Sequence, residues 1–256
     1  VTSVHGTLYL LPALLARVGE VHIARTHGGC DIGERPIDHV LDVLRCLGAE
    51  VVLRSDRIVA RASRLRGAAI TVARRGELDK YRSGATKAAL LAAATAEGTT
   101  TIEGAYTRAS ITELACCLRS LGARIEGDGT PTITVHGRRL HDGFYRVSGD
   151  YLEALTYLAL VAGCRGRIEV RGFSPAHCAK ELELLHAMGV EVRALEDGVE
   201  ARCEWPLEAR SFSTLEVDTD AQPILAAALT TARGRATIRE IVWERRFGYA
   251  EALLQM

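Results

Sequence analysis

Apolar stretches with helical spacing alternate along the chain with short runs of strand-forming residues. Four strand runs each follow a glycine, and an apolar stretch precedes each of them. The glycines are Gly19, Gly98, Gly166 and Gly234, and the apolar stretches are residues 10–16, 88–96, 155–162 and 224–231. The last two intervals between these glycines are both 68 residues, from 98 to 166 and from 166 to 234. This regularity predicts repeated helix–strand pairs in an α/β fold.

A second pattern follows each of the first three strand runs. Another helical stretch ends in a glycine, at Gly48, Gly122 or Gly189, and a further strand run comes next. Glycine at this place is typical of a left-handed helix cap. The predicted unit is therefore helix, strand, loop, helix, cap and strand, usually with one more strand behind it. Any α/β protein contains some glycine–strand patterns, but four matches in the same internal order favour a duplicated subdomain.

The repeat is cut short at both ends of the chain. In the third copy a cap glycine follows Met188, and the same count from Gly234 reaches Met256, the last residue. The first copy begins at its helix, with no strand in front. We therefore expect a chain that is incomplete relative to its own repeat, through a split gene, a shortened reading frame or a cloned fragment.

Composition and charge narrow the class of protein. The 256 residues include 32 Lys or Arg and 32 Asp or Glu, so bulk charge gives no support to a nucleic-acid or membrane-surface partner. The seven cysteines form no CxxC pairs, which favours a reducing cytoplasm over a disulfide framework. The histidines lack metal-ligand spacing, and we expect no metal and no cofactor. No basic residue directly precedes the apolar residues 8–15, which predicts a buried helix and not a signal segment.

The run GGCDIGERPID, residues 28–38, is the clearest candidate for chemistry. Its glycines permit positive φ angles and close approach of the backbone to a ligand. Pro36 stiffens the exit of the loop, and Arg35 offers a planar fork for a phosphate or a carboxylate. A thiol beside a fixed cation tends to be reactive, which makes Cys30 the candidate reactive group of the loop. The alternative is a surface turn that contains a cysteine by chance.

Four further motifs follow the loop in order: KYRSGAT at 80–86, AEGTT at 96–100, TDAQ at 219–222 and VWERRF at 242–247. With the 28–38 loop, they make residues 4–256 resemble the central part of the UDP-N-acetylglucosamine 1-carboxyvinyltransferase (enolpyruvyl transferase) family. The loop around Cys30 is not the pattern of the family's shikimate-pathway relatives.

The resemblance implies an α/β fold of two inside-out α/β prism domains. Each domain is a pseudo-threefold assembly of βαβαββ units, with helices inside and sheets outside. Residues 1–148 are expected to be the last two units of the loop-bearing (lid) domain, and residues 149–256 the first two units of the second domain. Both domains are then incomplete, and the chain crosses between them near residues 147–149.

The resemblance also implies a reaction and catalytic residues. The enolpyruvyl group of phosphoenolpyruvate moves to a sugar hydroxyl by addition and then elimination of phosphate, in the synthesis of a peptidoglycan precursor. Cys30 occupies the position of the cysteine that acts as acid, can hold phosphoenolpyruvate covalently and is alkylated by fosfomycin. Arg35 is expected to grip phosphoenolpyruvate, and Asp220 to be the base that takes the hydroxyl proton. The alternative for Asp220 is an acid that stabilises the N-terminus of the following helix.

The substrate-binding residues implied by the resemblance are Arg35, Pro36, Ile37, Asp38, Lys80, Ser83, Gly84, Thr219, Val242, Trp243 and Arg246. Residues 83–86 are expected to open a helix, whose N–H groups suit a phosphate. The alternative is an ordinary helix cap. Val242 and Trp243 are expected to line the sugar pocket, Arg246 to join a cationic cluster, and Arg245 to be a solvated charge.

The implied partners are phosphoenolpyruvate and a uridine nucleotide or nucleotide sugar, with no nucleic acid and no membrane. The family's lysine–asparagine pair near its start and an arginine near its end have no counterpart in this chain. We therefore expect weak or no activity from the chain alone, and possible complementing segments or a complementing chain.

Two departures from the family pattern leave the acceptor open. His5 and Tyr151 stand where the family has arginine. The alternatives are enolpyruvyl transfer to another uridine nucleotide in specialised metabolism, and a truncated, non-catalytic nucleotide-binding homologue. Retention of Cys30, Arg35, Lys80, Asp220 and Arg246 together favours an enzyme.

Overall fold

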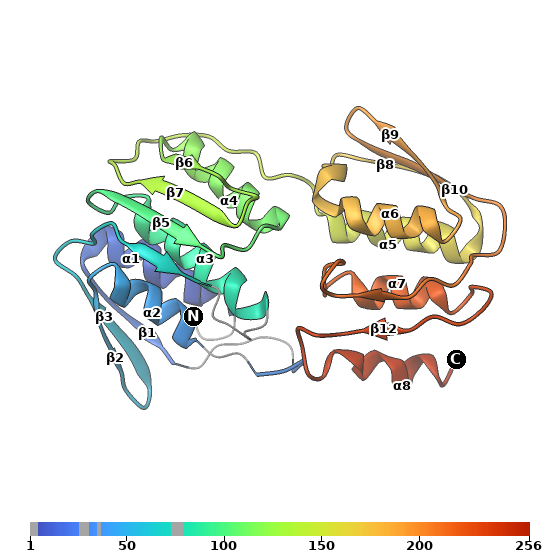
Figure 1. The fold of residues 1–256 in the computed structure, drawn as a ribbon, viewed down its shortest axis with the longest axis horizontal. Helices are drawn as coiled ribbons and strands as arrows, with labels where there is room; N and C mark the ends of the chain where they lie inside the picture. Colours follow the sequence, from blue (N-terminus) through green and yellow to red (C-terminus); the bar gives the residue numbers. More distant parts are fainter. Residues whose placement is uncertain (1–4, 26–30, 35–36, 73–78) are drawn as a thin grey trace. The chain divides into compact units, whose positions relative to one another are not determined.

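The protein divides into two compact units in a computed structural model, which describes residues 5–25, 31–34, 37–72 and 79–256 (Figure 1). Unit 1 comprises Val1–Asp31 and Arg35–Val147, and unit 2 comprises Ile32–Glu34 and Ser148–Met256. Both units are mixed α/β, and each has its own hydrophobic core. Each unit is therefore described by itself.

Unit 1 contains four α-helices and seven strands among its described residues. A short 3₁₀ helix (His5–Tyr9) comes first. The elements that follow are α1 (Leu10–Val18), β1 (Glu20–Ala24), α2 (Asp38–Cys46), β2 (Glu50–Leu53), β3 (Arg57–Arg61), β4 (Ala69–Thr71), α3 (Asp79–Ala93), β5 (Thr99–Glu103), α4 (Ala109–Ser120), β6 (Arg124–Glu126) and β7 (Thr132–His136). They form one sheet of order β1–β3–β2 and another of order β4–β5–β7–β6.

The predicted repeat is visible in unit 1. The strands predicted after Gly19 and Gly98 are β1 and β5, and each pairs antiparallel with a later strand, β3 or β7. The cap glycines Gly48 and Gly122 have φ angles of 90° and 92°, in the left-handed region. A glycine reaches this region without the steric penalty of a Cβ atom. The sequence pattern therefore located these helix ends correctly.

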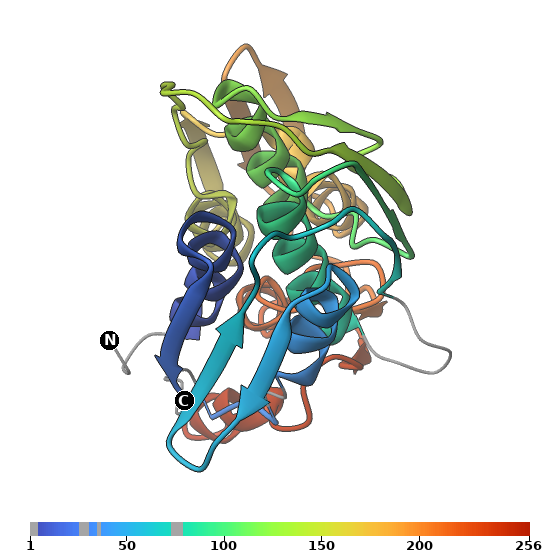
Figure 2. The ribbon, with the colours of Figure 1, turned by 90° about the vertical axis from the view of Figure 1, so that its left-hand side faces the viewer.

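Helix α3 is the centre of unit 1. Its alanines Ala88, Ala89, Ala92 and Ala93 are fully buried, as is Leu90. Small side chains let neighbouring helices approach closely, and α3 contacts α1, α2 and α4. Figure 2 shows the β1–β3–β2 sheet on one side of these helices. A buried central helix with a sheet outside it agrees with the arrangement that the resemblance implied.

The apolar residues 8–15 are buried on one face only. Leu8, Leu11 and Leu15 are buried in the core of unit 1, whereas Leu10 and Leu14 are exposed by 51% and 41%. The segment is also not one helix, because a 3₁₀ turn ends at Tyr9 and α1 begins at Leu10. The predicted buried helix is thus amphipathic in this structure.

Unit 2 contains four further α-helices and five strands. They are α5 (Tyr151–Cys164), β8 (Gly166–Arg171), α6 (Ala179–Ala187), β9 (Glu191–Leu195), β10 (Gly198–Cys203), β11 (Phe212–Ser213), α7 (Gln222–Leu229), β12 (Ile238–Arg239) and α8 (Tyr249–Leu253). Two 3₁₀ helices (Pro175–Cys178 and Arg246–Gly248) complete the unit. The sheets have the orders β8–β10–β9 and β11–β12.

The repeat continues in unit 2 but weakens at its end. The strand predicted after Gly166 is β8, and the cap glycine Gly189 has a φ angle of 102°. After Gly234, only Ile238 and Arg239 form a strand, and this strand pairs parallel with β11. The fourth predicted strand is therefore shorter and later than its sequence pattern indicated. Helices α5 and α7 pack on each other in the core.

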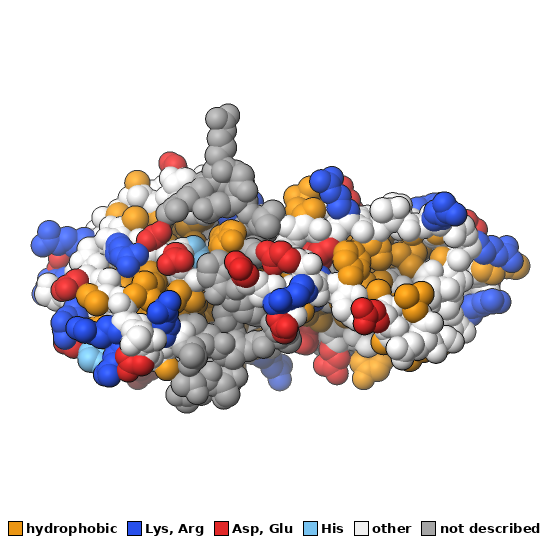
Figure 3. Space-filling model, turned by 90° about the horizontal axis from the view of Figure 1, so that it is seen from below, with side chains coloured by type: hydrophobic (Ala, Val, Ile, Leu, Met, Phe, Trp, Pro, Cys, Tyr) orange, Lys and Arg blue, Asp and Glu red, His pale blue; other side chains and the backbone are white. Residues whose placement is uncertain are grey.

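On the face shown in Figure 3, basic and acidic side chains lie among one another. The six cysteines that the structure describes are free thiols. Across the described ranges, no helix is both long and apolar enough to cross a membrane.

Candidate active site

The loop that carries the candidate thiol lies partly outside the described residues. This applies to Cys30, Arg35 and Pro36, and also to the side chain of Lys80. Ile37 is described at the N-cap of α2, and Asp38 is the first residue of that helix. The roles predicted for the loop residues remain predictions.

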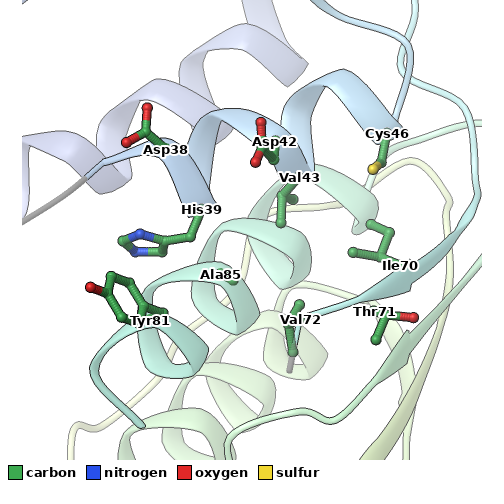
Figure 4. Close-up of a pocket in the computed structure, with 10 residues that line it drawn as sticks. All are labelled: Asp38, His39, Asp42, Val43, Cys46, Ile70, Thr71, Val72, Tyr81 and Ala85. Carbon is green, nitrogen blue, oxygen red and sulfur yellow. The ribbon is translucent and has the colours of Figure 1, made fainter. Parts of the chain in front are cut away.

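A cavity of about 320 Å³ in unit 1 lies beside Asp38 (Figure 4). Helix α2 contributes Asp38, His39 and Asp42, and helix α3 contributes Tyr81. The rings of His39 and Tyr81 meet edge to face, with centroids 5.7 Å apart. The cavity therefore has an aromatic wall and acidic side chains at its rim.

Residues 83–86 do not open a helix, which corrects the sequence-based prediction. Helix α3 begins at Asp79, so Ser83 and Gly84 lie in its second turn. Backbone N–H groups at this depth are used within the helix and are not free for a phosphate. Gly84 has a packing reason instead, because a Cβ atom there would overlap the imidazole of His39.

Unit 2 brings Asp220 and Arg246 together. A guanidinium nitrogen of Arg246 donates to Oδ1 of Asp220 at 2.6 Å. The Asp220 side chain is 56% exposed, whereas that of Arg246 is only 12% exposed. Nε of Arg246 is buried and has no hydrogen-bond partner among the described residues. The pair thus combines an accessible carboxylate with a buried cation that keeps one donor available.

The position of Asp220 relative to helix α7 does not by itself distinguish a base from an acid that stabilises the N-terminus of the helix. Helix α7 begins at Gln222 after the N-cap Ala221, so Asp220 stands one residue outside the helix. Its carboxylate accepts a hydrogen bond from Arg246. An acid that only stabilises a helix N-terminus does not require a contact with a largely buried arginine, whereas Asp220 makes such a contact.

Glu240 gathers three of the predicted site residues around one carboxylate. Its Oε2 accepts from the Thr219 hydroxyl at 2.9 Å. Its Oε1 accepts from the Val242 N–H at 2.7 Å and from the Trp243 N–H at 3.2 Å. The Thr214 hydroxyl donates to the same oxygen at 3.0 Å. Sequence reasoning missed Glu240, because a single acid after a short strand has no distinguishing pattern.

Replacing Glu240 with glutamine is expected to destabilise unit 2 by about 1–3 kcal/mol, because one of the four donors then faces an NH₂ group. Both tryptophans, Trp205 and Trp243, lie in unit 2, so urea unfolding followed by tryptophan fluorescence reports this unit. The exposed Glu183, which pairs with Lys180, is the matched control. Glu183→Gln should change the free energy of unfolding by less than about 0.5 kcal/mol. Equal effects of the two substitutions would contradict the role of Glu240.

The segment Ile32–Glu34 of the loop belongs to unit 2. The Arg245 N–H donates to the Ile32 carbonyl at 2.9 Å. Gly33 lies so close to Trp243 and Glu244 that a Cβ atom would overlap the Glu244 carboxylate. Arg245 is exposed, as its predicted solvated charge requires. Ile32 and Gly33 therefore lie against residues 243–245.

Comparison with known proteins identifies the family. The sequence model of the EPSP synthase (3-phosphoshikimate 1-carboxyvinyltransferase) family matches residues 5–256. A UDP-N-acetylglucosamine 1-carboxyvinyltransferase from Methylobacterium sp. (strain 4-46) is 37% identical over 262 residues, covering all of this chain and 59% of the relative. One from Staphylococcus aureus (strain MRSA252) is 36% identical and covers 100% of this chain and 60% of the relative. The predicted resemblance is confirmed.

Solved structures agree with this result. The enolpyruvyl transferase NikO from Streptomyces tendae has a TM-score of 0.83 and 34% identity, over 98% of this chain and 60% of that protein. An EPSP synthase from Acinetobacter baumannii has a TM-score of 0.63 at 17% identity, over 92% of this chain and 56% of its own, which concerns the fold alone. The α/β fold class is confirmed, and the chain spans about three fifths of the length of these relatives. The chain belongs to the EPSP synthase (3-phosphoshikimate 1-carboxyvinyltransferase) family.

Proposed function

We propose that this protein transfers the enolpyruvyl group of phosphoenolpyruvate to a hydroxyl of UDP-N-acetylglucosamine and releases phosphate, a step toward a peptidoglycan precursor. The observation that carries the proposal is the Asp220–Arg246 pair, 2.6 Å apart, beside residues that Glu240 holds in place. The names of the relatives from Methylobacterium and S. aureus support the substrates. The six free thiols support a reducing compartment, the cytoplasm.

The proposed reaction has an addition step and an elimination step. In the addition, the acceptor oxygen bonds to C2 of phosphoenolpyruvate, its proton passes to Asp220, and the methylene carbon takes a proton from Cys30. In the elimination, the new methyl carbon returns a proton to the Cys30 thiolate, the C2–C3 double bond re-forms, and the C2–O bond to phosphate breaks, so that phosphate leaves. Arg246 and Arg35 stabilise the negative charge of the carboxylate and the phosphate. Cys30 can alternatively hold phosphoenolpyruvate covalently.

We assign the remaining site residues by substrate. The nucleotide is bound by Arg35, Pro36, Ile37, Asp38, Lys80, Ser83 and Gly84, and the sugar by Thr219, Val242 and Trp243. Residues 1–148 form the lid-bearing domain, and residues 149–256 the second domain. The cavity beside Asp38 supports the nucleotide assignment, because it opens between α2 and α3 next to that residue.

A second candidate acceptor is another uridine nucleotide. The observation in its favour is Tyr151, whose hydroxyl donates to Asp218 at 3.0 Å in unit 2. The family resemblance places an arginine at this position. A phenol in place of a guanidinium removes one positive charge close to Asp220, and this changes which acceptor groups the site favours.

We further propose that a complementing segment, in the same polypeptide or in another chain, completes unit 1. A groove of about 1330 Å³ runs along α1, α3 and α4 in this unit. Its lining combines apolar side chains with charged ones: Ala13, Ala16, Leu91, Leu118 and Leu121, and Arg17, Arg64, Glu97, Arg138 and Asp142. The proposed occupant is a segment equivalent to the part of the relatives that this chain does not span.

The test is phosphate release from phosphoenolpyruvate, with UDP-N-acetylglucosamine or UMP as acceptor. We expect little release from the 256-residue chain alone, and release when the remaining segments of the Methylobacterium relative are supplied. Cys30→Ala should abolish that release. Calorimetry with both nucleotides measures binding by the chain alone. If the completed protein releases no phosphate, the proposed function is contradicted. If the chain alone gives no binding heat with UDP-N-acetylglucosamine and none with UMP, the proposed nucleotide binding is contradicted.

A further inference from the structure

Asp218 lies where three separate elements of unit 2 converge. Its Oδ2 accepts from the hydroxyl of Tyr151, the first residue of α5, at 3.0 Å. Its backbone N–H donates to Oε1 of Glu181, in the first turn of α6, at 2.6 Å. Its Oδ1 accepts from the backbone N–H of Asp220 at 2.8 Å. The Asp218 side chain therefore links α5 to the backbone of the candidate base, and its backbone N–H links the same turn to α6.

We propose that Asp218 is a positioning residue for Asp220, and that the Tyr151 hydroxyl sets the orientation of the Asp218 carboxylate. The role in catalysis rests on the proposed function, in which Asp220 takes the acceptor proton. The proposal concerns two residues that no predicted site role included.

The exposure of Asp220 gives the first reason. Its side chain is 56% exposed and stands outside α7, so packing does little to fix it. The direction of the side chain is then set by the backbone of the turn together with the hydrogen bond from Arg246. The bond from the Asp220 N–H to Asp218 Oδ1 closes an Asx turn, and the Ala221 N–H donates to the Asp218 carbonyl at 3.0 Å. A base must be held within hydrogen-bond reach of its proton, so this turn bears directly on proton transfer.

The surroundings of Asp218 give the second reason. Glu181 is only 2% exposed, and a buried carboxylate is costly unless it accepts hydrogen bonds. Its bond to the Asp218 N–H therefore fixes the start of the turn. Burial, with Asp218 as a further cause, raises the pKa of Tyr151 far above its usual range, so the phenol remains an O–H donor at neutral pH.

The third reason is that the Tyr151 side chain carries no charge. A tyrosine donates one hydrogen bond to Asp218 without neutralising its carboxylate. A basic side chain at position 151 would compete with Arg246 for the neighbouring carboxylates. With Tyr151 at this position, Arg246 pairs with Asp220, and the Asp218 carboxylate accepts the hydrogen bond from the Asp220 backbone N–H.

The test compares Asp218→Ala, Asp218→Asn and Tyr151→Phe in the chain. NMR measures the exchange of the Asp220 amide with water, and the Ala221 amide, bonded to a backbone carbonyl, is the internal reference. Loss of one hydrogen bond should speed Asp220 exchange about tenfold in Asp218→Ala and leave Ala221 within about threefold. Asp218→Asn keeps an acceptor oxygen and should stay within about threefold of the unmodified chain at both amides. Tyr151→Phe should speed Asp220 exchange about threefold.

The phosphate-release assay gives the second readout. Asp218→Ala should lower kcat about 10- to 100-fold with both KM values within about threefold, and Asp218→Asn should recover most of that loss. The control is Asp197→Ala, an aspartate of unit 2 that lies outside the turn, is 56% exposed and pairs with Arg171. It should affect neither readout.

Unchanged Asp220 exchange in Asp218→Ala, or an equal change at Ala221, would overturn the positioning role. Unchanged exchange in Tyr151→Phe would overturn the role of the hydroxyl. No turnover in the unmodified, completed protein contradicts the proposed function instead, and the amide result stands apart from it.

Discussion

Asp220→Asn is expected to lower kcat for phosphate release by about a hundredfold to ten-thousandfold, the usual contribution of a general base. Asparagine has nearly the shape of aspartate but cannot accept the hydroxyl proton. The Asp220 carboxylate is accessible, and it accepts a hydrogen bond from the Arg246 side chain at 2.6 Å. The KM values should change little, because the substitution removes a function that is needed in the transition state more than in binding. Steady-state kinetics with the completed protein measures both constants.

Asp197 provides a matched control for this substitution. Its side chain is exposed by 56%, the same fraction as Asp220, and it pairs with Arg171 at 3.0 Å in unit 2. Asp197→Asn removes the same charge from an equally exposed carboxylate whose arginine partner is itself 53% exposed. It should leave kcat within about twofold, since exposed ion pairs contribute little. If Asp220→Asn keeps kcat within the same range while Cys30→Ala abolishes release, Asp220 is not the base.

Local patterns account for the part of the fold that the sequence predicted. The glycines at 48, 122 and 189 all adopt left-handed φ angles at helix ends. Such a cap depends on one residue and its immediate neighbours, so its signal is contained in a short stretch of sequence. The first three strands after a glycine also formed as predicted. The strand after Gly234 is reduced to two residues that pair parallel with β11, a pairing that no local pattern encodes.

The candidate site was predictable only through the resemblance. Asp220 and Arg246 are 26 residues apart, and nothing in their spacing indicates that they meet. Glu240 and Asp218 act through hydrogen bonds to backbone N–H groups, which accept any residue type as donor. The prediction that residues 83–86 open a helix was wrong because serine and glycine are common at helix starts. Here Gly84 lies inside α3 and allows the close approach of the His39 side chain.

Leu90→Ala is expected to lower the free energy of unfolding of unit 1 by about 2–5 kcal/mol, the range for large-to-small substitutions in a core. Leu90 is fully buried on α3, and the buried residues around it on that helix are mainly alanines. Such short side chains cannot reach into the space that the leucine leaves, so the cavity persists. We therefore expect the upper part of this range.

The separate cores make the effect of Leu90→Ala specific to one unit. Leu90 belongs to the core cluster of unit 1, and unit 2 has a cluster of its own that includes Leu155. Amide hydrogen exchange should therefore accelerate across α3 and β5, while α5 keeps its protection. Leu10→Ala, at a leucine of the same unit that is 51% exposed, should change stability by less than about 0.5 kcal/mol. Equal loss of protection in α5 would mean that the two units unfold as one, and that their cores are not independent sources of stability.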